Sequence, residues 1–179
     1  MVITLIGYRG CGKSTVANAL ADAIGWKSVD ADVELEQRAG RSIREIFVTD
    51  GESEFRRLEF ELLEELLQRD RLVLAAGGGA ILNPETRKRM RKAGPVIWLM
   101  ASAETLYRRI SGDATTQQRR PNLTSDGGYT EVVRLLKQRR PLYRETATIT
   151  CDAESQSPEQ IVGQLLQQIE PLISGNATS

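Results

Sequence analysis

A glycine-rich segment near the start of the chain constrains the fold more than any other feature. Residues 7–15 read GYRGCGKST, a match to G-x-x-x-x-G-K-[ST], and they directly follow the apolar run 2–6. A buried strand, a glycine-rich turn and a helix in this order form a phosphate-binding loop. Its glycines let backbone N–H groups turn toward an anion, and the following helix directs its positive end to the same place.

The residues of this loop contribute in different ways. Lys13 supplies a positive charge for the β- and γ-phosphates of ATP, and the Ser14 hydroxyl is a ligand for Mg²⁺. The Cys11 thiol, in an electropositive loop, is expected to react with alkylating agents and to be protected by MgATP. The residues expected to bind the nucleotide in this loop are Gly10, Cys11, Gly12, Lys13, Ser14 and Thr15.

Short apolar runs alternate with helical periodicity along the chain. The runs expected to be strands are 2–6, 27–29, 72–75, 96–99 and 147–151. This alternation predicts a three-layer α/β fold with a central, five-stranded parallel sheet flanked by helices. Because ligands bind at the C-terminal ends of parallel strands, the loops 7–15, 30–32 and 77–79 should open onto one crevice.

The remaining segments complete the expected organisation. A helix over 53–69 places Arg56 and Glu59 together off its apolar stripe, and a helix over 129–139 should end before Pro141. We expect one domain over residues 1–170. Within it, the polar stretch 112–127 is expected to act as a mobile lid, and residues 171–179 form a frayed tail.

The composition disfavours several classes of protein. Basic and acidic residues number 24 each, so the net charge of zero argues against nucleic acid or an anionic membrane as the main partner. No apolar run approaches the roughly 20 residues that cross a bilayer, and no signal peptide is recognisable. Two cysteines, both expected to be reduced, suggest a cytoplasmic protein. The chain has no histidine, which excludes His-dependent catalysis and His-containing metal sites. The expected metal is therefore a hard ion held by oxygen atoms.

Two carboxylates follow the second predicted strand, in the sequence Asp30-Ala31-Asp32. Asp30 is expected to hold Mg²⁺ through water, and Asp32 to orient or deprotonate an acceptor hydroxyl. Aspartate also favours the position that caps the start of a helix, so a capping pair is the alternative interpretation.

Glycines and arginines supply the remaining candidates. Gly77-Gly78-Gly79 follows the third strand and lets backbone N–H groups approach a ligand, although a flexible turn would also use glycine. Arg120 lies in the predicted lid and would neutralise charge in the transition state. Arg56 and Arg139 suit the planar carboxylate of an acceptor, the alternative being that they are solvated surface residues.

Taken in order, these motifs resemble the shikimate kinases, P-loop kinases of the nucleoside-monophosphate-kinase-like fold. The motifs are GYRGCGKST, DAD at 30–32, GESEFRRLE at 51–59, AAGGGAIL at 75–82, RRP at 119–121 and RRPLY at 139–143. The resemblance implies transfer of the γ-phosphoryl group of MgATP to the 3-hydroxyl of shikimate, with Lys13, Asp32 and Arg120 catalytic. It also implies that Arg109 flanks adenine and that Arg120 contacts phosphate and acceptor. The implied shikimate-binding residues are Asp32, Arg56, Gly77, Gly78, Gly79 and Arg139.

The chain departs from the family pattern at the lid. It reads Arg120-Pro121-Asn122-Leu123 where the family has Arg-Pro-Leu-Leu, the segment 111–118 is long, and Arg119 makes the lid arginine ambiguous by one residue. Two alternatives remain: another small-molecule P-loop kinase, such as a gluconate-type kinase, or a noncatalytic nucleotide-binding regulator. The second is disfavoured because Lys13, Asp32 and Arg56 are all present. We expect a monomer with small-molecule substrates.

Overall fold

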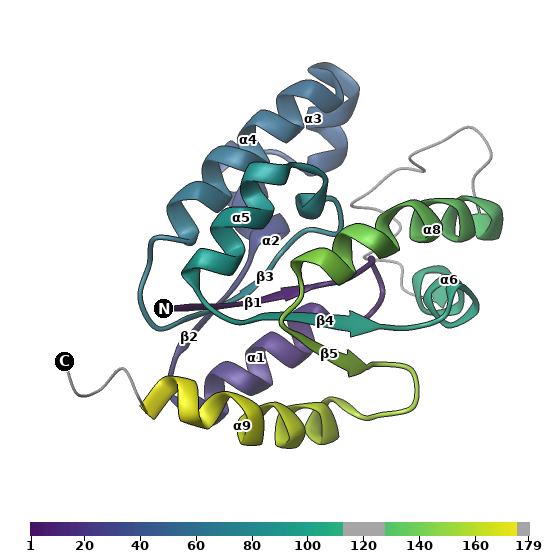
Figure 1. The fold of residues 1–179 in the computed structure, drawn as a ribbon. Coiled ribbons are helices and arrows are strands. Elements are labelled where there is room, and N and C mark those ends of the chain that lie inside the picture. Colours follow the sequence, from purple (N-terminus) through teal and green to yellow (C-terminus); the bar gives the residue numbers. More distant parts are fainter. Residues whose placement is uncertain (113–127, 175–179) are drawn as a thin grey trace.

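A five-stranded, wholly parallel sheet forms the centre of the computed structural model, which describes residues 1–112 and 128–174 (Figure 1). The strands lie in the order β2-β3-β1-β4-β5. This sheet confirms the predicted fold class. The strand bounds are β1 (Val2–Ile6), β2 (Lys27–Asp30), β3 (Leu72–Ala75), β4 (Val96–Met100) and β5 (Ile149–Asp152).

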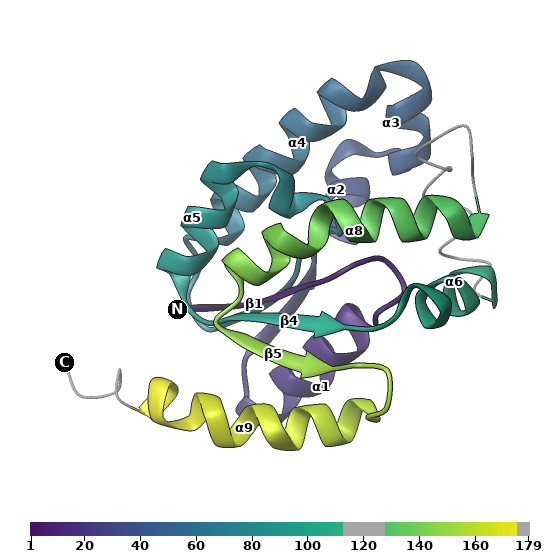
Figure 2. The ribbon, with the colours of Figure 1, turned by 45° about the vertical axis from the view of Figure 1, so that its right-hand side comes forward.

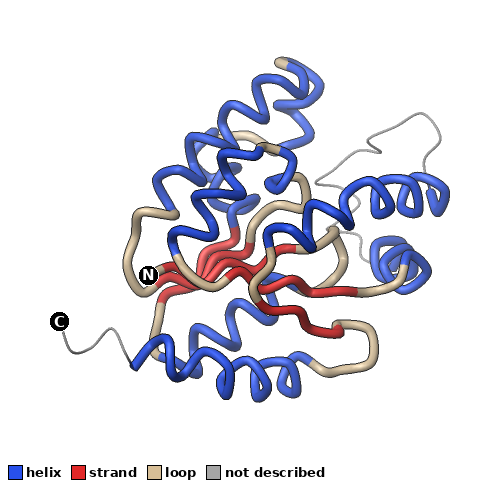
Figure 3. Tube along the Cα trace, viewed as in Figure 1, coloured by secondary structure: helices blue, strands red, loops and turns tan. Residues whose placement is uncertain are grey.

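Helices cover both faces of the sheet, as Figures 2 and 3 show. One face packs against α1 (Lys13–Ile24) and α9 (Pro158–Ser174). The short α3 (Ile43–Thr49) lies beside α4, the 3₁₀ turn η1 (Ala80–Leu82) follows β3, and α6 (Ala103–Gly112) follows β4. The helices on the opposite face are α2 (Ala31–Ala39), α4 (Gly51–Leu66), α5 (Pro84–Ala93) and α8 (Gly128–Thr146).

The alternation of side chains along β1 divides the core into two clusters. Ile3 and Leu5 belong to a cluster with residues of α1 and α9, whereas Val2 and Ile6 belong to a cluster with residues of α4 and α5. All four are buried, because a parallel strand between two layers of helices has no solvated face. The backbone at the C-terminal end of β1 is therefore held from both sides, where the phosphate loop begins.

Local sequence signals explain where several helices begin and end. Gly25 adopts a left-handed conformation (φ 67°) and ends α1, as expected. Asn83 accepts a hydrogen bond from the Glu85 N–H at 2.8 Å and caps α5, which confirms the start predicted at Asn83-Pro84. Ser42 and Glu45 form a reciprocal capping box at the start of α3.

Two predicted helix boundaries are wrong. The helix expected to end before Pro141 continues to Thr146, and the tail expected to start at residue 171 is helical to Ser174. Proline removes one backbone hydrogen bond and costs about 3 kcal/mol in a helix interior. In α8, burial of Tyr143 and Thr146 beyond Pro141 offsets that loss, and the Thr146 hydroxyl donates to the Leu142 carbonyl at 2.6 Å.

The predicted lid falls almost entirely outside the described residues, and with it Arg119 and Arg120. Gly112, its first residue, ends α6. None of the helices within residues 1–112 and 128–174 could span a bilayer.

Candidate functional site

The phosphate loop lies between β1 and α1, at the C-terminal edge of the sheet. Gly10 (φ 80°) needs to be glycine for two reasons: its backbone is left-handed, and a Cβ atom would lie 2.9 Å from Ile110 Cγ1 of α6. Gly12 (φ 93°) occupies the N-cap of α1. The loop therefore directs the start of α1 toward the position expected for phosphate, with Ser14 and Thr15 exposed in the first turn.

Lys13 braces the loop from inside. Its ammonium group donates to the carbonyl oxygen atoms of Gly7 at 3.0 Å and of Tyr8 at 3.1 Å. A turn is closed by the Cys11 N–H, which donates to the Tyr8 carbonyl at 3.3 Å. The charge that the sequence predicts for the β- and γ-phosphates is thus held at the loop.

The expectation of a reactive Cys11 thiol is corrected by the structure. Cys11 is only 2% exposed, and its Sγ lies 3.8 Å from the Lys13 ammonium group. The same Sγ would be 2.8 Å from a Cβ atom on Gly7, so the side chain fills the space beneath the loop. A buried thiol in this position packs the loop, and its burial disfavours reaction with alkylating agents.

Asp30 caps a helix and also contacts the phosphate loop. One carboxylate oxygen accepts from the N–H groups of Asp32 at 2.9 Å and Val33 at 3.3 Å, which caps α2. The other oxygen accepts a hydrogen bond from the Ser14 hydroxyl. Asp32 lies half-buried in the first turn of α2, at the end of β2. The capping interaction therefore belongs to Asp30 and leaves its second oxygen at the phosphate loop.

Ser14 and Asp30 also provide the chemistry for a hard metal ion. A hydroxyl and a carboxylate oxygen next to a phosphate loop are ligands that Mg²⁺ accepts, together with water and phosphate oxygens. Among the described residues there is no cluster of three or more His, Cys, Asp or Glu that could hold a metal. The donors present thus fit an ion that shares its ligands with a nucleotide.

The turn that follows β3 packs directly on the phosphate loop. A Cβ atom on Gly78 would lie 3.4 Å from the Arg9 nitrogen and 3.4 Å from the Gly7 oxygen. A Cβ atom on Gly79 would lie 2.5 Å from Nη1 of Arg56. A Cβ atom at Gly78 would thus make ordinary contacts with the phosphate loop, whereas glycine at position 79 leaves room for the Arg56 guanidinium.

Glutamates hold Arg56 over this turn. The Arg56 guanidinium contacts the Glu59 carboxylate at 2.6 Å and the Glu52 carboxylate at 3.1 Å, and Cζ lies 5.0 Å from the centroid of the Phe55 ring. The pairing with Glu59 confirms that the two side chains lie together. Glu59 is buried, which the sequence pattern did not indicate. The guanidinium is thus oriented in advance, as a planar contact with a carboxylate requires.

Arg139 of α8 contacts the same turn. Its Nη1 donates to the Gly78 carbonyl at 3.3 Å, and the Tyr143 hydroxyl donates to the same oxygen at 2.7 Å. Arg139 is buried, so it is not one of the solvated surface arginines. Burial raises the pKa of Tyr143 far above its ordinary value, against the opposing effect of Arg139. The tyrosine therefore stays a neutral hydrogen-bond donor.

Three further residues next to this turn were missed by the sequence analysis. Arg9 of the phosphate loop forms an ion pair with Glu131 of α8 at 2.8 Å. The buried ring of Tyr8 lies 5.7 Å from Arg139 Cζ, measured to its centroid, and burial raises the Tyr8 pKa. Their partners are more than 100 residues away along the chain, so no local pattern could reveal these contacts.

The remaining predicted residues lie as follows. Arg109 is half-buried in the last turn of α6, the helix that packs on Gly10. Gly77 is buried, and its carbonyl accepts from the Ala80 N–H at 3.0 Å. Arg120 belongs to the segment outside the described residues. The structure therefore brings Arg56, Arg139 and the glycine turn together beside the phosphate loop, and it places Asp32 at the end of the strand adjacent to β3.

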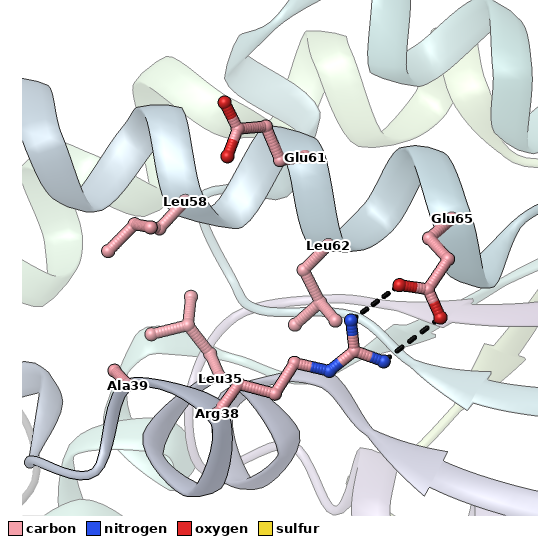
Figure 4. A pocket seen from close by; sticks show the side chains of 7 residues that line it. All are labelled: Leu35, Arg38, Ala39, Leu58, Glu61, Leu62 and Glu65. Carbon is pink, nitrogen blue, oxygen red and sulfur yellow. Dashed lines mark hydrogen bonds and ion pairs between the residues drawn. The ribbon is translucent and has the colours of Figure 1, made fainter.

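A separate cavity of about 220 Å³ lies between α2 and α4 (Figure 4). Its walls are Leu35, Ala39, Leu58 and Leu62, and the Arg38–Glu65 ion pair closes one side. It includes none of the predicted site residues.

The fold and the site together define a class of protein. A parallel sheet with a phosphate loop after its central strand, and a second polar turn beside that loop, is the arrangement of P-loop kinases for small molecules. A family model described as "Shikimate kinase" matches residues 9–170. The chain belongs to the shikimate kinase family.

Individual relatives support this assignment. The chain is 41% identical to a shikimate kinase from Rhodopirellula baltica, over 91% of this chain and 87% of that one. It is 38% identical to one from Enterococcus faecalis, over 94% and 98%. A solved structure of shikimate kinase from Acinetobacter baumannii in complex with shikimate superposes with a TM-score of 0.83 and 36% identity, covering 99% and 95% of the two chains.

A more distant structure shows the fold alone. A gluconokinase from Sinorhizobium meliloti superposes with a TM-score of 0.61 at 18% identity, over 98% of this chain and 95% of that one. The fold alone therefore does not identify the acceptor.

Proposed function

We propose that this protein transfers the γ-phosphoryl group of ATP to the 3-hydroxyl of shikimate, giving shikimate 3-phosphate and ADP. The observation that carries the proposal is the convergence of Arg56 and Arg139 on the Gly77–Gly79 turn, which itself packs on the phosphate loop. Two guanidinium groups held in place beside that loop suit a small acceptor with a carboxylate. Membership of the shikimate kinase family supplies the identity of that acceptor.

Asp32 is the proposed base in this reaction. It accepts the proton of the acceptor hydroxyl as the oxygen attacks the γ-phosphorus, and the bond between that phosphorus and the β,γ-bridging oxygen breaks to release ADP. Lys13 stabilises the charge on the phosphates, and Arg120 is proposed to do so from the segment 113–127. Arg56 and Arg139 hold the carboxylate, and Gly77, Gly78 and Gly79 line the acceptor. Asp32 also holds the ring hydroxyls.

The nucleotide is proposed to lie along the loop and the start of α1. The N–H groups of Gly10, Cys11, Gly12, Lys13, Ser14 and Thr15 bind its phosphates, and Arg109 flanks adenine. The Ser14 hydroxyl would ligate Mg²⁺, and Asp30 would hold it through water. When bound, the ion neutralises charge on the β- and γ-phosphates. The Ser14–Asp30 hydrogen bond, which places both oxygen atoms at the loop, supports this proposal.

We also propose a cytoplasmic monomer. Two buried, free cysteines are consistent with a reducing compartment. Size-exclusion chromatography coupled to light scattering tests the monomer, because the measured mass of a dimer would be twice 19.9 kDa.

A coupled assay of ADP release tests the function. Shikimate, quinate, gluconate and a set of nucleoside monophosphates are supplied separately with MgATP. Turnover with shikimate above all others is expected. Turnover of gluconate with shikimate inert would favour a gluconate-type kinase, and nucleotide binding without turnover of any acceptor would favour a regulator.

A further inference from the structure

A buried ion pair joins the phosphate loop to the helix that carries Arg139. The Arg9 guanidinium contacts the Glu131 carboxylate at 2.8 Å, and the Glu131 side chain is 0% exposed while that of Arg9 is 14% exposed. A buried carboxylate is costly unless it is paired, so Arg9 and Glu131 hold each other in place. Arg9 is thereby turned toward α8 and is committed to this contact.

The ion pair belongs to a group of contacts that joins the phosphate loop, the glycine turn and α8. Arg139 and Tyr143 of α8 both donate to the Gly78 carbonyl. A Cβ atom added at Gly78 would lie 3.4 Å from backbone atoms of Arg9 and Gly7, so the glycine turn lies beside the phosphate loop. The phosphate loop, the glycine turn and α8 are therefore neighbours of one another.

The buried ring of Tyr8 lies next to both Arg9 and Arg139. Its centroid lies 5.9 Å from Cζ of Arg9 and 5.7 Å from Cζ of Arg139, so two guanidinium groups from different elements share one aromatic ring. A shift of the phosphate loop would move Tyr8 and Arg9 together. Glu131 and Arg139, eight residues or about 12 Å apart on one rigid helix, would move with them.

We propose that Arg9 and Glu131 are positioning residues that couple the nucleotide site to the acceptor site. Nucleotide orders the phosphate loop, the ion pair transmits that order to α8, and Arg139 is fixed for the carboxylate of the acceptor. By linkage, acceptor binding must strengthen nucleotide binding by the same factor. The inference rests on the proposed function, because shikimate is the acceptor used to test it.

The test measures the dissociation constant of shikimate by calorimetry, with and without saturating MgADP. In the wild-type protein, MgADP should tighten shikimate binding by about fivefold or more, a common size for coupling between two sites. In Arg9→Met/Glu131→Leu, which replaces both members of the ion pair with apolar side chains, the ratio of the shikimate dissociation constants without and with MgADP should approach one. Shikimate alone should bind both proteins with similar affinity.

Two further variants keep the test decisive. Glu131→Gln preserves the shape of the side chain and should also lower the ratio if the double variant does not fold. Arg89→Met/Glu64→Leu removes a pair between α5 and α4, 2.7 Å in length and partly exposed, and should leave the ratio unchanged. A purely structural pair would change the melting temperature without changing the ratio.

The outcomes separate the inference from the proposed function. A wild-type ratio of one, or an unchanged ratio in a folded variant of Arg9 or Glu131, overturns the coupling while shikimate turnover stands. Failure of wild-type protein to bind or phosphorylate shikimate overturns the proposed function itself.

Discussion

At the scale of single residues, the carboxylate of Asp32 is the group on which the proposed reaction depends most. It lies half-buried at the start of α2, where Asp30 already supplies the helix cap. Asp32→Asn should therefore fold and bind ATP, since the amide preserves the shape of the side chain.

The turnover number of Asp32→Asn should fall by about 10²-fold or more, because the variant cannot accept the proton of the hydroxyl. Glu34→Gln, which removes another carboxylate from the first turn of the same helix, is the matched control and should retain activity. Steady-state kinetics with both substrates measures this. A turnover number near the wild-type value in Asp32→Asn would reduce Asp32 to a structural role.

Arg139 and its neighbour Arg140 offer a matched pair of arginines. Arg139 is buried and directed at the glycine turn, whereas Arg140 is exposed. Arg139→Lys should raise the KM for shikimate far more than the KM for ATP, because lysine keeps the charge but cannot make a planar, two-pronged contact. Arg140→Lys should change neither value.

Truncation of Arg139 to alanine should cost about 2–5 kcal/mol of acceptor binding. The effect of Arg56→Lys should not simply add to that of Arg139→Lys, since both side chains hold one carboxylate. The two KM values in each single variant and in the double variant measure this. A rise in the KM for ATP alone would place Arg139 in the nucleotide site.

Gly79 tests the packing of the acceptor turn. Its backbone (φ −102°) suits any residue, so Gly79→Ala strains the chain only through the Cβ atom that meets the Arg56 guanidinium. A displacement of that group by about 1 Å would lower kcat/KM for shikimate by up to about 10²-fold. Gly163→Ala, at a position with nothing within 4 Å of the added atom, is the control. Equal kinetics in the two variants would contradict this account of the turn.

At the scale of elements, the ion pair between Arg38 of α2 and Glu65 of α4 should weaken in acid. The hydrogen bond from Arg38, and then that from Arg69, lowers the pKa of Glu65 to about 2. A carboxylate whose pKa is lower in the folded protein stabilises it above the unfolded pKa of about 4.5, and this contribution is lost as the pH falls toward 2.

Glu65→Gln should therefore lower the melting temperature slightly at pH 7, since Glu65 is exposed and its pairs are screened by solvent. The difference from wild type should shrink as the pH falls from 4.5 toward 2. Thermal melts followed by circular dichroism over this range measure it, with Glu61→Gln on the same helix as the control. A difference that stays constant across the window would mean that the Arg38 contact does not persist in solution.

The elements also show which boundaries can be predicted. Gly25 and Asn83-Pro84 end and begin helices as expected, because capping depends on adjacent residues. Pro141 did not end α8, because that outcome depends on what Tyr143 contacts after the chain has folded: the Gly78 carbonyl and the ring of Trp98. Local chemistry was sufficient in the first case and tertiary packing decided the second.

At the scale of the whole molecule, the parallel sheet could be predicted because apolar runs alternate with helical periodicity. The meeting of the loops after β1 and β3 then follows from the rule for parallel sheets. The Arg9–Glu131 pair could not be predicted, since an arginine and a glutamate 122 positions apart carry no mutual signal. Predicting such contacts requires the strand order and the path of α8.

The stacking of Trp98 on Tyr143 has a practical consequence. The two rings lie 5.7 Å apart, and Tyr143 is bonded to the same carbonyl that Arg139 contacts, so the indole adjoins the residues proposed to hold the acceptor. The other tryptophan of the chain, Trp26, lies between α1 and β2 and packs against the core cluster on the other face of the sheet. The protein thus contains its own optical probe: ultraviolet emission from Trp98 should respond when the acceptor site fills, whereas emission from Trp26 should not.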